Sequence, residues 1–178
     1  AAVAGYTIAI RLVVFAILPS WGLANAAATL VGQNLGAGRP ERAEASVWRA
    51  GLYNMVFLLG VAILFIAGAG PLIGVFSSDP EVVRLGVSCL VWVSLGYPFY
   101  AWGMVVVQAF NGAGDTYTPT VINLFCYWLF QLPLAHLLAH SAGLGPAGVF
   151  AAITLAESLI AVVALLVFRR GRWRRRRV

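Results

Sequence analysis

Five long apolar stretches, separated by short polar connections, constrain this chain more than any other feature. They cover about residues 6–32, 45–69, 82–110, 119–139 and 147–168. Each has the roughly 20 residues that an α-helix needs to cross the hydrocarbon core of a bilayer. Because lipid satisfies no backbone hydrogen bond, such a chain can fold only as a bundle of membrane-spanning helices. The sequence therefore predicts an all-α, polytopic transmembrane helix bundle.

Charged residues are few, and the basic ones predict which side of the membrane each connection faces. Charged residues make up 10% of the chain and hydrophobic ones 61%, and all the basic side chains are arginines. Seven arginines lie in the tail at residues 169–178, and three more are Arg39, Arg42 and Arg49. Because arginine is retained on the cytoplasmic side, we expect the tail and the connections near residues 33–43 and 111–118 to be cytoplasmic. The tail directly follows an apolar helix, so we expect it to face the lipid bilayer and to bind no nucleic acid.

Two connections share a pattern of turn-forming residues. The first contains Gln33, Asn34, Gly36 and Gly38, and the second contains Asn111, Gly112, Gly114, Asp115, Thr116 and Pro119. Asparagine and glycine tolerate the positive φ angle that ends a helix, either Asp115 or Thr116 can cap the next helix, and proline fits its first turn. These turn-forming residues can be explained simply as two well-capped tight turns between helices, with no further function.

Polar side chains recur on single faces of the predicted helices. The faces contain Asn25 with Thr29 and Gly32; Tyr97, Tyr100, Met104, Gln108 and Asn111; Asn123, Tyr127 and Gln131; and Thr154, Glu157, Ser158 and Ala161. Residues three and four apart lie together on a helix. Each face has two interpretations that the sequence leaves open: packing between helices through small and polar residues, or the lining of a substrate cavity.

Glu157 is the outstanding ionisable residue. It lies ten residues into the last span, which corresponds to a depth of about 15 Å at about 1.5 Å per residue. A carboxyl group at that depth is expected to be neutral or partnered. Two interpretations remain: a structural hydrogen bond to a neighbouring helix, or exchange of a proton or a cationic substrate.

The remaining reactive side chains indicate no enzyme and no metal site. Cys89 and Cys126 lie inside apolar stretches, where a thiol packs as a small hydrophobic group. His136 and His140 are four residues apart but lack a nearby third ligand, which favours a polar cap at the membrane surface. A membrane-embedded enzyme would need a nucleophile and base, or a metal set, in one place, whereas these residues are scattered among separate spans.

Residues 32–38 (GQNLGAG), 111–116 (NGAGDT) and 119–120 (PT) resemble the corresponding segments of the multidrug and toxic compound extrusion (MATE) family. The resemblance covers the whole chain and implies the last five helices of a twelve-helix, two-lobed transporter. It implies a secondary antiporter of the bacterial inner membrane that exports organic cations and amphipathic compounds in exchange for H⁺ or Na⁺. The chain begins without methionine, and we expect the N-terminal lobe to precede it as a partner of this lobe.

The resemblance leaves the coupling ion open. Proton-coupled relatives use acidic residues of the first lobe, and sodium-coupled relatives use carboxylates of the seventh and tenth helices. The span that would be the tenth helix has no Asp or Glu between residues 86 and 110. Its tyrosines, Tyr97 and Tyr100, are candidates to line the path of a flat cation. The alternatives are a related flippase for a lipid-linked substrate, a membrane-embedded enzyme and a channel; we expect no cofactor beyond the coupling ion.

Overall fold

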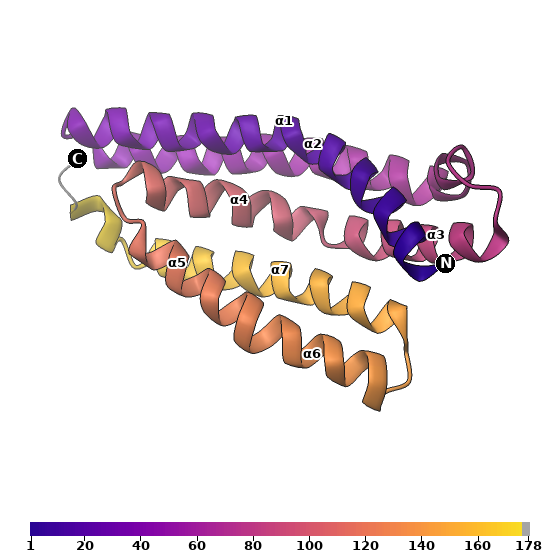
Figure 1. Ribbon diagram of the computed structural model, residues 1–178. Helices are drawn as coiled ribbons and strands as arrows, with labels where there is room; N and C mark the ends of the chain where they lie inside the picture. Colours follow the sequence, from indigo (N-terminus) through magenta and orange to yellow (C-terminus); the bar gives the residue numbers. More distant parts are fainter. Residues whose placement is uncertain (176–178) are drawn as a thin grey trace.

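The computed structural model describes residues 1–175, and all the regular secondary structure in this range is helical (Figure 1). In order, the elements are α1 (Ala2–Gly36), α2 (Pro40–Gly74), α3 (Pro80–Leu95), α4 (Tyr97–Gly112), α5 (Tyr117–Asn123), a π-helical segment η1 (Leu124–Gln131), α6 (Leu132–His136), a second π-helical segment η2 (Leu137–Ser141), α7 (Pro146–Arg169) and a short 3₁₀-helix η3 (Arg172–Arg175). The predicted all-α transmembrane bundle is confirmed. The part of the predicted tail at residues 176–178 lies outside the described residues.

Each predicted span lies within one helix or one interrupted helix. α1, α2, the continuous helix at residues 117–141 and α7 are long and apolar enough to cross a membrane. α3 and α4 satisfy the same test together, with a bend of 56° between them. The predicted span at residues 82–110 is therefore broken at Gly96, just before α4.

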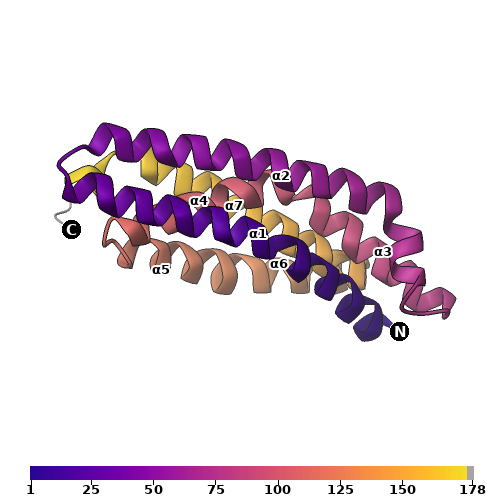
Figure 2. The ribbon, with the colours of Figure 1, turned by 90° about the horizontal axis from the view of Figure 1, so that it is seen from above.

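The helices form an antiparallel bundle in which the connections alternate between its two ends (Figure 1). The α1–α2 turn, the α4–α5 turn and η3 lie at one end, and the N-terminus and the α3 start lie at the other. α1, α2 and α4 pack against one another, and α7 packs against α3, α4 and the helix at residues 117–141 (Figure 2). The two glycine-rich turns and the basic tail thus share one end of the bundle, as the sequence predicted.

The two glycine-rich turns have the same backbone conformation. Gly38 has a φ angle of 67° and Gly114 one of 72°. The preceding residues match as closely, with φ and ψ angles of −83° and 4° at Ala37 and of −84° and 6° at Ala113. A positive φ costs glycine little because it has no Cβ atom, and this is the one position in each turn that needs it.

The same hydrogen bond closes both turns. The Arg39 N–H donates to the Asn34 carbonyl at 2.8 Å, and the Asp115 N–H donates to the Phe110 carbonyl at 2.9 Å. A bond over five residues that follows a left-handed glycine defines a Schellman motif. The sequence repeat is therefore a repeat of one helix cap.

The structure corrects the expected roles of two residues in the second turn and decides which of Asp115 and Thr116 caps the next helix. Asn111 and Gly112 lie in the last turn of α4 and have no positive φ angle. Thr116 precedes α5 but its side chain makes no capping hydrogen bond. Asp115 is the cap, since its carboxylate accepts hydrogen bonds from the Thr118 N–H at 3.2 Å and from the Thr118 hydroxyl at 2.8 Å.

Gly112 is needed for a close approach of two helices. A Cβ atom on Gly112 would lie 2.2 Å from the backbone oxygen of Ala28 in α1. A Cβ atom on Gly32 would lie 3.1 Å from the backbone oxygen of Gly112. Small residues allow helices in a membrane to approach until their backbones touch. The second glycine motif therefore joins α4 to α1 as well as ending α4.

A side chain of α7 stabilises the break between α3 and α4. The Gly96 N–H donates to the Val93 carbonyl at 3.0 Å, three residues back, and this leaves the Trp92 carbonyl without its usual helical partner. The Thr154 hydroxyl donates to that carbonyl at 2.7 Å. Because lipid offers no donor, a polar side chain from a neighbouring helix is needed to satisfy this backbone group.

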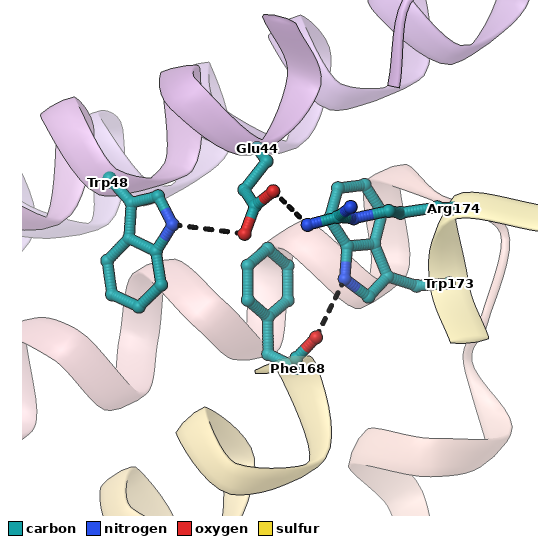
Figure 3. Close-up of polar contacts among 5 residues, drawn as sticks. All are labelled: Glu44, Trp48, Phe168, Trp173 and Arg174. Carbon is teal, nitrogen blue, oxygen red and sulfur yellow. Dashed lines mark hydrogen bonds and ion pairs between the residues drawn. The ribbon is translucent and has the colours of Figure 1, made fainter. Parts of the chain in front are cut away.

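The beginning of the basic tail is folded against the bundle (Figure 3). Trp173 is buried, and its indole N–H donates to the Phe168 carbonyl at 3.0 Å. Its ring stacks on the Phe168 ring, with 4.6 Å between the ring centroids. Arg174 forms an ion pair with Glu44 of α2, which also accepts a hydrogen bond from Trp48 at 3.3 Å. The sequence indicated only a basic segment here, and it gave no sign of this contact.

The two glycine motifs should differ in their tolerance of a methyl group. Gly112→Ala should lower the free energy of unfolding by about 1–3 kcal/mol, because the new Cβ atom forces α4 away from the α1 backbone. Gly36→Ala is the matched control, since a Cβ atom there meets no atom within 4 Å. Unfolding of the purified protein in mixed micelles would measure both. Equal effects of the two substitutions would contradict the proposed close approach.

The bond across the break can be tested by removing one hydroxyl. Thr154→Val keeps the shape of the side chain and leaves the Trp92 carbonyl unsatisfied, so it should destabilise the protein by about 1 kcal/mol. Thr154→Ser retains the hydroxyl and should recover most of the loss. The same unfolding assay would compare them, and a serine variant no more stable than the valine variant would show that packing alone matters at this position.

Candidate functional site

A cavity of about 470 Å³ lies between α1, α4, the helix at residues 117–141 and α7. Its lining residues are Ile10, Val13, Val14, Ile17, Leu18 and Trp21 of α1; Tyr100, Gly103, Met104, Val107 and Gln108 of α4; Asn123 and Tyr127; and Glu157 and Ile160 of α7. Most of this wall is apolar, with a few polar groups on the side formed by α4, α5, η1 and α7. Such a composition is typical of a site for a small amphipathic molecule.

Glu157 is the only carboxylate among the lining residues, and two tyrosines contact it. The Tyr127 hydroxyl donates a hydrogen bond of 2.9 Å to Glu157 Oε1. The Tyr100 hydroxyl interacts with the same carboxyl group. The carboxyl group thus joins α7 to α4 and to η1, and its two tyrosine partners were not identified from the sequence. This geometry suits both a structural hydrogen bond and an exchange site.

A chain of amide side chains extends from the cavity toward the end with the glycine-rich turns. The Gln108 amide donates to Asn25 Oδ1 at 3.1 Å, and the Asn111 amide donates to Gln108 Oε1 at 2.8 Å. Gln108 lines the cavity, Asn25 belongs to α1, and Asn111 belongs to the second glycine motif. Asn111 therefore connects the turn to the cavity through its side chain, in agreement with its predicted place on the same helix face as Gln108.

Several residues of the predicted polar faces do not line this cavity; among them are Tyr97, Gln131 and Asn25, of which Asn25 is linked to it by a hydrogen bond from Gln108. Tyr97 is buried against Phe65, with ring centroids 6.3 Å apart, and its hydroxyl has no hydrogen-bond partner within residues 1–175. As the first residue of α4 it follows the break at Gly96, and it packs with the core formed by α1, α2 and α3. Gln131 does not line the cavity either, and its buried Oε1 also lacks a partner in the described part of the chain.

A π-helical segment, η1, follows Asn123 and ends at Gln131. Asn123 and Tyr127 both line the cavity, as predicted from their four-residue spacing. From residue 124 to 131 the helix has the wider turn of a π-helix, in which bonds join residues five apart. Gln131, four residues after Tyr127, is the last residue of η1 and is not among the residues that line the cavity. π-helical segments are rare and frequently occur at functional sites.

Sequence reasoning missed the apolar wall that α1 contributes. Ile17, Leu18 and Trp21 line the cavity, but in the sequence they cannot be distinguished from residues that face lipid. Trp21 could have been suspected from the sequence, since it lies four residues before Asn25 and so on the same side of the helix as that polar face. The sequence does not show that this side of α1 faces α4 and the cavity.

The other reactive residues form no site in residues 1–175. His136 and His140 have ring centroids 4.8 Å apart, and no group of three or more potential metal ligands exists in this range. Cys89 and Cys126 are buried and form no disulfide. The cavity around Glu157 is therefore the candidate functional site.

Comparison with known proteins identifies the family. The MatE family profile matches residues 1–137. A "Probable multidrug resistance protein NorM" of Thermotoga maritima is 27% identical over 177 residues, which are 99% of this chain and 38% of the relative. A protein of the same description from Pseudomonas aeruginosa is 35% identical over 155 residues, which are 84% of this chain and 32% of the relative. The chain thus spans about two fifths of the length of such relatives.

Solved structures agree with the fold. The MATE transporter ClbM in complex with Rb⁺ superposes with a TM-score of 0.91 at 24% identity, over 99% of this chain and 42% of ClbM. An inward-facing multidrug resistance MATE transporter of the MOP superfamily gives a TM-score of 0.84 at 22% identity, over 92% of this chain and 38% of its own. The relatives are named as multidrug transporters and not as enzymes. Because the family profile matches more than half of its residues, this chain belongs to the MATE family of multidrug transporters.

Proposed function

We propose that this chain is most of the second lobe of a secondary efflux antiporter, which exports organic cations and amphipathic compounds in exchange for H⁺ or Na⁺. The observation that carries the proposal is the placement of Glu157, a carboxyl group deep in the membrane that is held by two tyrosines in a mainly apolar cavity. Ionisable residues inside membrane segments are rare and mark substrate or ion pathways.

The cavity supports a flat, apolar cation as substrate. Its volume of about 470 Å³ is within the range of sites for drug-sized ligands. Trp21, Tyr100 and Tyr127 provide aromatic faces that attract a cation, and Glu157 provides the opposite charge. A lipid-linked diphosphate would need cationic partners, and neither lysine nor arginine is among the lining residues. The flippase alternative therefore receives no support from this cavity.

Exchange follows if the coupling ion and the substrate compete for one carboxyl group. A proton neutralises Glu157 and removes the charge that attracts a cationic substrate. Alternatively, Na⁺ binds to oxygen atoms, which Glu157, Tyr127 and Asn123 supply from the cavity wall. In either case the substrate leaves when the coupling ion binds, which is the requirement for antiport.

The proposed transporter also needs a second lobe and an orientation. Alternating access arises when two halves of a transporter rock around a shared site, and the chain covers 38% of the Thermotoga relative. We assign the glycine-rich turns and the arginine-rich tail to the cytoplasmic side of a bacterial inner membrane. The support is the concentration of arginine at that end of the bundle.

The role of Glu157 can be tested with a substitution that preserves its shape. Glu157→Gln in the full-length transporter removes titration but still accepts the Tyr127 hydrogen bond. In proteoliposomes the rate of export driven by an imposed H⁺ or Na⁺ gradient should fall about tenfold or more, while a neutral substrate still binds. Glu41→Gln, outside the cavity, is the matched control. Export by the Glu157→Gln variant with an unchanged dependence on both gradients would remove this residue from the mechanism.

The orientation can be tested by labelling single cysteines in a full-length version without Cys89 and Cys126. Arg42→Cys and Arg172→Cys should react with a membrane-impermeant reagent only from the cytoplasm. Ser78→Cys, in the connection between α2 and α3, should react only from outside. Labelling of Arg172→Cys in intact cells would reverse the proposed orientation.

A further inference from the structure

We propose that a groove between the ends of α1 and α2 binds the phosphate group of an anionic phospholipid. The groove has a volume of about 480 Å³ and shares no lining residue with the cavity around Glu157. Leu30, Gln33 and Asn34 of α1 line one side, and Arg42, Ser46 and Arg49 of α2 line the other. It lies beside the first glycine-rich turn, at the end of the bundle that carries the tail.

Two uncompensated arginines give the groove its charge. Arg42 and Arg49 are seven residues apart on α2, with Ser46 between them on the same face. Within residues 1–175 the ion pair of Arg174 with Glu44 is the only one, so neither arginine of the groove is neutralised by a carboxylate. No acidic residue lines the groove. A guanidinium group matches the geometry of a phosphate, which it binds through two parallel hydrogen bonds.

The remaining polar groups leave one further donor for the phosphate. The Ser46 hydroxyl donates to the Arg42 carbonyl at 2.8 Å, and the Asn34 amide donates to the Leu30 carbonyl at 2.7 Å. Both donors are therefore used within their own helices. The Gln33 side chain makes no hydrogen bond within residues 1–175 and lines the groove from α1. The available donors are thus two guanidinium groups and one amide, a set that selects an anion.

The position of the groove along α2 corresponds to the level of lipid headgroups. α2 has 35 residues, which give about 52 Å at about 1.5 Å per residue, whereas the hydrocarbon core is about 30 Å thick. Residues 50–74 of α2 contain no charged residue, so the apolar part begins directly after Arg49. Arg42 lies about 10 Å further out along the axis. Anionic headgroups of the cytoplasmic leaflet occupy this level.

The surface beyond the groove favours a lipid over free phosphate. Tyr53 and Val56 continue the spacing of Arg42, Ser46 and Arg49 toward the hydrocarbon, so they share the same face of α2. Their side chains are 63% and 62% exposed. A lipid acyl chain can pack along this surface, from which free phosphate gains nothing. The bound lipid would hold the ends of α1 and α2 together on both sides of their connecting turn.

The proposal predicts a preference for anionic lipid that depends on the groove. Full-length transporter in neutral detergent should be stabilised against heat by phosphatidylglycerol and should retain it in native mass spectrometry, with weaker retention of phosphatidylcholine. Arg42→Gln/Arg49→Gln should reduce the affinity for phosphatidylglycerol about tenfold or more, since each arginine contributes a charge-assisted contact. Gln33→Leu, which keeps both charges, should reduce it less but measurably. Drug binding at the Glu157 cavity should be unchanged in both, which shows that they are folded.

Arg39→Gln/Arg170→Gln is the charge-matched control, because it removes two exposed arginines from the same end of the bundle and outside the groove. This control should keep the preference for phosphatidylglycerol. An equal loss in the control would show a general attraction to anionic membranes and would overturn the proposed groove. Stabilisation by inorganic phosphate as large as that by phosphatidylglycerol would overturn the assignment to lipid. A full preference in Arg42→Gln/Arg49→Gln would overturn the proposal altogether.

Discussion

The hydrogen bond from Thr154 to the Trp92 carbonyl is the contact on which the cavity depends. It satisfies the backbone group that the break between α3 and α4 would otherwise leave bare, so α4 can leave α3 at an angle of 56°. That angle sets the course of α4 along α7 and brings Tyr100 beside Glu157, one turn after Thr154. One helix, α7, therefore contacts the chain on both sides of the break.

Backbone contact, more than side-chain interlocking, sets the spacing of the other helices. The backbone of Gly112 contacts that of Ala28. The backbone of Gly5 approaches that of Gly86 so closely that a Cβ atom on Gly5 would lie 2.8 Å from the Gly86 nitrogen. Gly51 leaves room for the Trp102 ring, which a Cβ atom would approach to 2.2 Å. Since lipid is as apolar as the helices, contacts of this kind replace the hydrophobic effect as the source of association. The polar contacts of the cavity depend on helices held this closely.

The sequence predicted the elements of this structure better than the direction of their side chains. Long apolar runs are stable in lipid as α-helices, so the spans could be predicted from hydropathy. The repeated glycine motif forms the same helix cap twice, so the turns could be predicted from local residue types. Glu157 stood out because a carboxyl group in an apolar run has few explanations. Tyr97 and Gln131 were assigned from helical spacing, which places a side chain on a face of a helix but does not give how far along the helix the cavity extends. The contacts of Arg174 with Glu44 and of Gly112 with Ala28 arise between segments far apart in the chain, so no local pattern encodes them.

The π-helical segment η1 has a consequence for how relatives of this protein are compared. Loss of one residue between positions 124 and 131 would close a wider turn into an α-helical one, so it would change which residues of this segment face the cavity while the helix after it keeps nearly the same orientation. A homologue with such a deletion would present different side chains to the same space while keeping an almost identical hydropathy profile. Within this family, the length of one helix can therefore change the chemistry of the cavity without any substitution in its lining.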